Sequence, residues 1–116
     1  MLRIAGDINF TDGFFDTGFG TGSSIKKKAD PFGNLRRAKD DFWIGNLECV
    51  CASHSDKTGL HGKQFIIAPQ SLSHIRHFDL YGVANNHVMQ HGGEAYREML
   101  GYLQGAGVGY VGSLDR

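Results

Sequence analysis

The sequence predicts an α/β fold with a mainly parallel sheet and helices packed on it. Short apolar runs typical of buried strands occur at residues 2–5, 42–44 and 80–84. Segments with helical spacing of apolar residues separate these runs, as in strand–helix–strand units. Each run also stops abruptly at polar residues. In parallel sheets such residues meet at the carboxyl edge, where ligands bind.

Size and charge limit the classes of function. The chain has 116 residues with 12 Lys plus Arg and 12 Asp plus Glu, so its formal charge of zero gives no attraction for nucleic acid or an acidic membrane. No run approaches the roughly 20 apolar residues of a membrane span. The strand-like start leaves no room for a signal peptide. We therefore expect a cytoplasmic location, or envelope association if the sequence is an excised segment.

The first strand is predicted at residues 2–5 and is ended by Gly6 and Asp7. This position puts a carboxylate where a parallel strand leaves the sheet, so Asp7 is a candidate metal ligand. The alternative is an aspartate that only caps a turn or a helix.

A glycine-rich loop is predicted next, within a single domain that spans residues 1–116. Residues 13–24 contain too much glycine for regular structure, and the loop as a whole extends over 13–30. Lys26, Lys27 and Lys28 follow the glycines. These cations either meet an anionic substrate or form a solvated surface.

A helix is predicted from Asp30 to about Lys39, because an N-cap residue precedes Pro31 at the first helical position. The strand at residues 42–44 then ends in Gly-Asn-Leu-Glu at 45–48, which again places an amide and a carboxylate at a strand end.

The two cysteines are expected to be reduced and structural. Cys49 and Cys51 are two residues apart, a poor geometry for a disulfide with each other. The sequence has no second pair to complete a four-cysteine zinc site.

The remaining elements follow from periodicity and turn residues. Residues 52–62 are turn-forming, 65–67 are extended, and Pro69 opens a helix that directs Leu72 and Ile75 inward. A helix over 94–104 has one apolar side and ends at a glycine, Gly105 or Gly107, before a fourth strand at 108–111. That side comprises Ala95, Met99, Leu100 and Leu103.

Asn85, Asn86 and His87 follow the buried run at residues 80–84. Asparagine and histidine tolerate unusual backbone conformations, which favours a tight turn that presents these side chains. A polar turn without function is the alternative. Oxygen ligands from the three strand ends, with an imidazole nearby, suit Mn, Mg, Fe or Zn. Two such ions suffice to clamp a phosphoryl group and generate hydroxide.

Five motifs appear in the order found in one known family. They are G-D-I at 6–8, D-P-F at 30–32, G-N-L-E at 45–48, K-x-F at 63–65 and A-N-N-H at 84–87. In this the chain resembles the CapA-like bacterial capsule and poly-γ-glutamate synthesis proteins of the calcineurin-like metallophosphoesterase superfamily. The resemblance implies the amino-terminal half of a four-layer αββα sandwich and a metal-dependent phosphoesterase-like hydrolase.

The resemblance also implies roles for individual residues. Asp7, Asn86 and either Asn46 or Glu48 are similar to the metal ligands of the family, and His87 is similar to the histidine that assists the leaving group. Asn9, Asn85 and Lys63 are the residues expected to bind substrate.

The chain departs from the family pattern at three points. Asn9 stands where the superfamily usually has histidine, and Gln90 stands where an aspartate is common. Family members continue through a second half that supplies further histidines. We therefore expect the 116-residue chain alone to bind metal weakly and to be inactive.

Two function classes follow, with different partners. The first is a metal-dependent hydrolase of phosphoesters or a related anionic substrate, and the second is an assembly protein that binds a polyanion without turnover. An inactive truncated fragment is a third reading. An uncovered sheet edge predicts self-association or pairing with a complementing second half, and no nucleic acid partner is expected.

Overall fold

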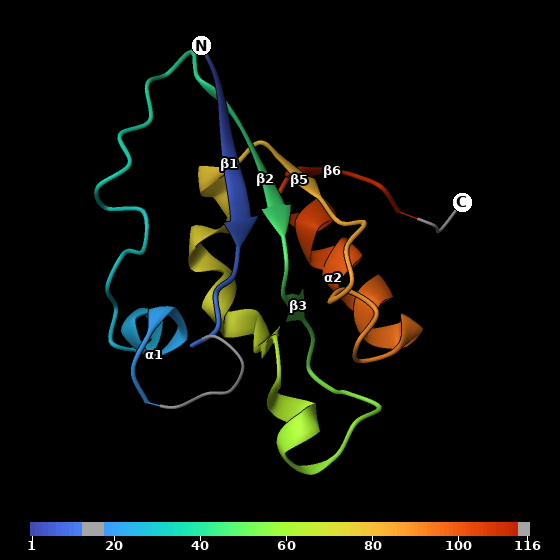
Figure 1. Cartoon of the computed structure of the whole chain (residues 1–116). Helices are drawn as coiled ribbons and strands as arrows, with labels where there is room; N and C mark the ends of the chain where they lie inside the picture. The colour runs from blue at the N-terminus through green and yellow to red at the C-terminus, as the bar shows by residue number, and fades with distance from the viewer. Residues whose placement is uncertain (13–17, 114–116) are drawn as a thin grey trace.

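The computed structural model describes residues 1–12 and 18–113. Its main sheet has four strands in the order β1-β2-β5-β6, and every neighbouring pair is parallel. A second, two-stranded parallel sheet joins β3 to β4. The predicted α/β fold with a mainly parallel sheet is therefore confirmed (Figure 1). The strands are β1 (Leu2–Ile8), β2 (Phe42–Leu47), β3 (Val50–Cys51), β4 (Ile66–Ile67), β5 (Leu80–Gly82) and β6 (Gly109–Val111).

In the described part of the chain, two α-helices and two 3₁₀ helices connect the strands. The longest is α2 (Gly93–Gly105), and the others are α1 (Thr21–Lys26), η1 (Gly59–Lys63) and η2 (Pro69–His77). Within residues 1–12 and 18–113, no helix has the length and apolar character needed to cross a membrane.

The larger helices η2 and α2 cover the same face of the main sheet. The Tyr81 hydroxyl of β5 donates to the Ile75 carbonyl of η2 at 2.8 Å. The Gln104 side chain of α2 donates to the Tyr110 hydroxyl of β6 at 2.9 Å. Tyr81 and Tyr110 are register partners and so point to the same side. Right-handed crossovers in a sheet whose strand order follows the chain give this one-sided arrangement, and Figure 1 shows the helices behind the sheet.

We call this side the covered face, and it carries most of the core. Trp43 and Tyr81 project from it, and both rings contact the ring of Phe78, which lies between η2 and β5. Met99 and Leu103 of α2 are fully buried. The two strands of the small sheet extend this core, since Val50 of β3 and Ile67 of β4 are also buried.

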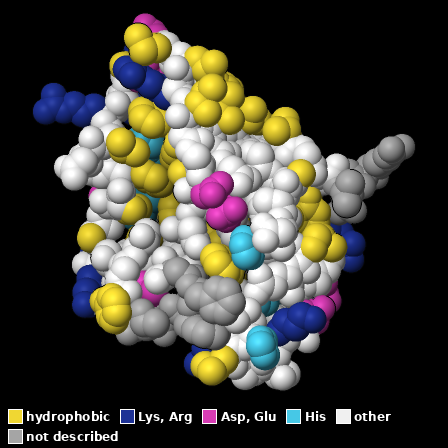
Figure 2. All heavy atoms as spheres, viewed as in Figure 1, with side chains coloured by type: hydrophobic (Ala, Val, Ile, Leu, Met, Phe, Trp, Pro, Cys, Tyr) yellow, Lys and Arg dark blue, Asp and Glu magenta, His cyan; other side chains and the backbone are white. Residues whose placement is uncertain are grey.

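The opposite side of the sheet, the open face, exposes apolar side chains. Leu2 and Ile4 of β1 are 58% and 75% exposed, and Phe42, the register partner of Leu2, is 47% exposed. Val111 of β6 is 53% exposed. Figure 2 shows hydrophobic side chains over the amino-terminal part of the sheet on this side.

A bulge in β1 decides the direction of Asp7. Ile4 pairs with Ile44 and Asp7 pairs with Asn46, so three steps along β1 match two along β2. Without the extra residue, strand alternation would turn Asp7 toward the covered face. The bulge instead brings Asp7 to the open face beside Asn46. Asp7 consequently lies within β1, which is longer than the predicted strand at residues 2–5.

The predicted glycine-rich loop over residues 13–24 is partly wrong. Residues 13–17 lie outside the described residues, but Ser23 and Ser24 belong to α1. The Asp12 carboxylate accepts hydrogen bonds from the Ser23 amide, at 2.7 Å, and from its hydroxyl. This external capping, which satisfies amides at the helix start, stabilises a helix that the local composition disfavours.

The helix predicted from Asp30 to about Lys39 is wrong, because turns and irregular backbone occupy that stretch. The Asp30 carboxylate accepts from the Phe32 amide at 2.9 Å, and the Asp41 carboxylate accepts from the Ala38 amide at 3.0 Å. These local bonds compete with the helical ladder. Arg37 meanwhile reaches Asp79 at 2.6 Å, which is 42 residues away in sequence.

The other predicted elements agree with the structure, apart from their ends. The inward-facing residues of the helix at 94–104 are all buried in α2, which ends at Gly105. The segment opened by Pro69 is helical but of the 3₁₀ type. Cys49 and Cys51 are both free, which agrees with the prediction that they do not form a disulfide, and both are buried. Burial raises the pKa of both thiols to about 12, so they are protonated and unreactive at neutral pH.

Candidate functional site

Side chains from three strand ends form one hydrogen-bonded line at the carboxyl edge of the sheet. The Asn46 amide donates to Asp7 Oδ1 at 2.8 Å, and the Asn85 amide donates to Asn46 Oδ1 at 3.1 Å. Asn85 also donates to the Leu47 carbonyl at 2.7 Å. The residues belong to β1, β2 and the turn after β5, so the parallel order of these strands assembles the line.

Asn85 shapes the turn that presents Asn86 and His87. Its side-chain oxygen accepts from the His87 backbone amide at 3.0 Å, an Asx-type turn. Val88, which is 3% exposed, anchors the turn in the core. Asn86 is exposed and His87 is half-buried, so both are accessible at the end of the line.

The His87 ring is held on one face and at one nitrogen. It stacks on Phe65 with ring centroids 4.0 Å apart and planes at 24°. Its Nδ1 lies 3.1 Å from Gln90 Oε1, and the Gln90 amide donates to Gln64 Oε1 at 2.8 Å. Because Gln90 presents its oxygen to the ring, Nδ1 donates the hydrogen bond. Nε2 is then the ring nitrogen without a hydrogen-bond partner among the described residues.

Phe65 adopts a backbone conformation that is unusual for a bulky residue. Its φ angle is 51°, in the left-handed region that costs energy for a residue other than glycine. Strain of this kind clusters at functional sites. Phe65 here forms the stacking platform for His87.

Glu48 lies close to Asp7 along the same edge. The Glu48 backbone amide donates to the Ile8 carbonyl at 2.9 Å, which fixes it beside the end of β1. Leu47 is buried, so strand alternation directs Glu48 toward the open face with Asn46. Within residues 1–12 and 18–113, neither Asp7 nor Glu48 forms an ion pair. Figure 2 shows acidic side chains beside a histidine in the middle of this face.

The donor set suits a hard cation but does not form a closed metal site. Asp7, Glu48 and the side-chain carbonyl of Asn86 supply oxygen atoms at the same edge. Among the residues that the structure describes, no three His, Cys, Asp or Glu side chains are grouped closely enough to hold a metal ion. A divalent ion here would depend on amide oxygens and water for much of its coordination.

The remaining predicted site residues lie beside the line rather than in it. Asn9 Oδ1 accepts from the Thr11 amide at 2.9 Å and from its hydroxyl at 2.7 Å, so it shapes the loop after β1. Lys63 ends η1 and is exposed. It lines a pocket next to the site.

Three contacts around His87 were missed as site residues. Phe65 stacks on the ring, Gln90 bonds its Nδ1, and Gln64 accepts from Gln90 in a bond that spans 26 residues of sequence. The K-x-F motif already contained Gln64 and Phe65. Gln90 was noted only as a departure from the family pattern, and the structure makes it the partner of His87 Nδ1.

Comparison with known proteins agrees with the motif order. The family model described as "Bacterial capsule synthesis protein PGA_cap" matches residues 1–116. A search of curated proteins finds no match. Because the matched region spans every residue of the sequence, the chain belongs to this family of bacterial capsule synthesis proteins.

Proposed function

We propose that this capsule synthesis protein carries a metal-dependent hydrolase site for a phosphoester or a related anionic substrate, and that its polymer is poly-γ-glutamate. The observation that carries the site is the line from Asp7 through Asn46 to Asn85, with His87 at its end. Polar side chains gathered from separate strand ends are typical of ligand sites in α/β sheets.

One or two divalent ions, Mn, Mg, Fe or Zn, would be held by Asp7, Glu48, Asn86 and Asn46. A bound ion of this kind polarises a phosphoryl oxygen and lowers the pKa of a bound water. The oxygen-rich donor set supports a hard cation. Few charged ligands lie at this edge of the sheet, so we expect weak binding with several waters retained.

His87 has the geometry to act on the leaving group. With Nδ1 donating to Gln90, Nε2 carries a proton only in the imidazolium form, and in that form it is the atom that would donate to a departing oxygen. Phe65 fixes the plane of the ring. Gln90 is neutral, so it orients the imidazole without the added stabilisation that a carboxylate gives to a charged ring.

The test is hydrolysis of bis(4-nitrophenyl) phosphate by the full-length version of the protein, with Mn²⁺ and with a chelator, because the 116-residue chain alone is expected to be inactive. Metal-dependent hydrolysis supports the proposal. His87→Ala should lower turnover by about 10²- to 10⁴-fold with metal content unchanged. Asn86→Ala should lower both. Unchanged turnover in a folded, metal-loaded His87→Ala protein would contradict the assigned role of His87.

Polyanion binding without turnover is the second candidate. The substitution of Gln90 for the aspartate common in the family favours it, because the histidine then lacks a charged partner. Binding of poly-γ-glutamate by a metal-loaded chain that hydrolyses no phosphodiester would support this candidate over the first.

A further inference from the structure

His91 is a fully buried polar residue that has no part in the proposed chemistry. It is 1% exposed and lies between the turn that presents His87 and the start of α2. Both of its ring nitrogens have partners: Nε2 lies 2.5 Å from the Gln64 carbonyl oxygen, and Nδ1 lies 2.5 Å from the Ser55 hydroxyl. These partners are 27 and 36 residues away in the sequence. His91 therefore joins three parts of the chain at one buried point.

The partners of His91 decide which nitrogen carries the proton. A carbonyl oxygen can only accept, so Nε2 donates to Gln64. In the neutral ring, Nδ1 then accepts from the Ser55 hydroxyl. The Ser55 oxygen in turn accepts from the Lys57 amide at 3.0 Å, and the Asp56 amide donates to the His91 carbonyl at 3.3 Å. Loss of one of these bonds would leave a buried polar group without its partner, which is costly.

The carbonyl that His91 holds belongs to the peptide group directly before Phe65. The unusual φ angle of Phe65, 51°, is a rotation relative to that peptide group. The peptide group after Phe65 is also held, because the Phe65 carbonyl accepts from the Val50 amide at 2.8 Å. A strained backbone conformation persists only where the surrounding structure fixes it. Hydrogen bonds thus fix the peptide groups on both sides of Phe65, and His91 Nε2 is one of the two donors.

The segment held in this way supports the His87 ring twice. The Phe65 ring stacks on it with centroids 4.0 Å apart. The Gln64 side chain accepts from the Gln90 amide at 2.8 Å, and the oxygen of the same Gln90 side chain lies 3.1 Å from His87 Nδ1. A change in the Gln64 peptide group would therefore disturb both the face and the Nδ1 atom of the ring.

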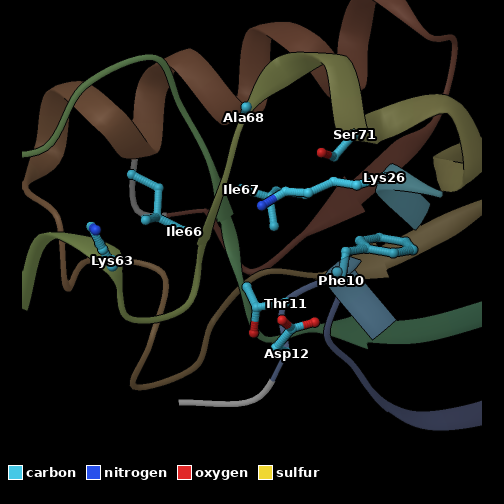
Figure 3. Close-up of a pocket in the computed structure, with 10 residues that line it drawn as sticks. Phe10, Thr11, Asp12, Lys26, Lys63, Ile66, Ile67, Ala68 and Ser71 are labelled. Carbon is cyan, nitrogen blue, oxygen red and sulfur yellow. The ribbon is translucent and has the colours of Figure 1, made fainter. Parts of the chain in front are cut away.

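The same segment adjoins the pocket beside the site. Lys63 and Ile66, the residues directly before and after 64–65, both line this pocket. Figure 3 shows the two side chains on the same side of it. A displacement of the peptide group held by His91 would alter this wall together with the support of His87.

We infer that His91 is a positioning residue for the His87 site. Its Nε2–H group holds the Gln64 carbonyl, and the segment held in this way keeps Phe65 stacked on His87 and Gln64 bonded to Gln90. Because His91 is buried, it acts through this segment and not on a ligand. The word site rests on the proposed function, whereas the effect of His91 on the geometry of Phe65 and His87 does not.

Two variants separate the two hydrogen bonds of His91. In His91→Gln the side-chain amide reaches the place of Nε2 and still donates to the Gln64 carbonyl. In His91→Asn the shorter side chain reaches only the place of Nδ1, so it keeps the Ser55 hydroxyl as a partner and loses Gln64. The His87 ring is observed by ¹⁵N NMR of the 116-residue chain, at a pH at which the imidazole is neutral.

The wild-type chain should show His87 protonated at Nδ1 and nuclear Overhauser contacts between its ring and that of Phe65. His91→Asn should lose most of these contacts and shift His87 toward a mixture of the two tautomers, whereas His91→Gln should keep the wild-type signals. His77→Asn is the matched control for a general loss of stability, because the His77 ring packs on Trp43 in the core. It should leave the His87 signals unchanged.

Three results would overturn the inference. One is a folded His91→Asn chain whose His87 signals match those of the wild type. Another is an equal change of these signals in both His91 variants or in His77→Asn, which would mean that any loss of stability disturbs the site. The third needs no variant and decides the case if His91→Asn does not fold. Slow solvent exchange of the wild-type His91 Nε2 proton supports the bond to Gln64, and exchange as fast as that of the exposed His61 overturns it.

These measurements need neither metal nor substrate, so they can fail independently of the proposed function. If His91 sets the geometry of His87 and the full-length protein hydrolyses nothing, only the proposed function is contradicted. If the full-length protein hydrolyses the phosphodiester and His91→Asn leaves the His87 signals unmoved, only this inference is contradicted.

Discussion

The two faces of the main sheet are built from alternate residues of the same strands, yet they differ in almost every property. On the covered face Trp43 and Tyr81 are buried under η2 and α2, and the tyrosine hydroxyl is hydrogen-bonded. On the open face Leu2, Ile4 and Phe42 are exposed. The same strands therefore supply stability on one side and accessible groups on the other.

The candidate site belongs to the open face. Asn46 reaches it by strand alternation and Asp7 because of the β1 bulge, and their hydrogen bond does not involve the core. The Asp79 carboxylate, in contrast, has structural partners in Arg37 and the Trp43 amide. We therefore expect substitutions on the covered face to change mainly the stability of the fold, and substitutions at the site on the open face to change mainly ligand binding.

The largest expected effect is on the covered face. Trp43→Ala should destabilise the fold by about 3–5 kcal/mol, the typical cost of removing a large buried aromatic side chain. Phe42→Ala, at the preceding position on the open face, should cost less than half as much, because 47% of Phe42 is already exposed. Urea unfolding of both variants measures the difference. An equal decrease in the free energy of unfolding in both variants would contradict the proposed difference between the two faces.

The next effect concerns Asp7. Asp7→Asn removes a charged oxygen ligand and should weaken Mn²⁺ binding by about tenfold or more, as loss of metal-site residues does. The asparagine keeps the shape of the side chain, and we expect the urea midpoint to stay close to that of the wild type. Calorimetric titration with Mn²⁺ gives the affinity. An unchanged affinity would remove Asp7 from the proposed metal site.

A smaller effect should appear in the pH dependence of stability. The Arg37 side chain holds the pKa of Asp79 below its ordinary value of 3.8. A carboxyl whose pKa is lower in the folded chain stabilises the fold at pH above 3.8, and this contribution is lost as the pH falls through the folded pKa. Asp79→Asn should lower the melting temperature at pH 7 and narrow its difference from the wild type at pH 3. A constant difference at both pH values would contradict this assignment.

The smallest effect on stability is expected at Ile4, which is 75% exposed. Ile4→Lys should change the free energy of unfolding by about 0.5 kcal/mol or less, as surface substitutions usually do. It should nevertheless reduce binding of a hydrophobic dye, since Ile4 is more exposed than the other large apolar side chains of the open face, Leu2, Phe42 and Val111. Self-association also stays a prediction: light scattering should show fewer oligomers for this variant. A strictly monomeric wild-type chain that binds no dye would count against it.

Much of the fold could be predicted from the sequence because its signals are local. The apolar runs that became β2 and β5 and the one-sided helix α2 depend on alternation or helical spacing, which neighbouring residues specify. The polar residues at the strand ends could also be predicted, as could the absence of a disulfide between the two cysteines. These properties follow from the tendency of apolar side chains to be buried and of polar side chains to stay in contact with water.

The tertiary structure decided what depends on distant partners. The Asp12 carboxylate, which accepts from the Ser23 amide, stabilises the helix at residues 21–26. Where a helix was predicted from Asp30, the chain is irregular and Arg37 bonds to the distant Asp79. The bulge that turns Asp7 to the open face arises from pairing with β2. The setting of His87 depends on Phe65 and on a glutamine pair 26 residues apart. A local pattern cannot specify such contacts, because their free energy exists only after the chain has brought remote segments together.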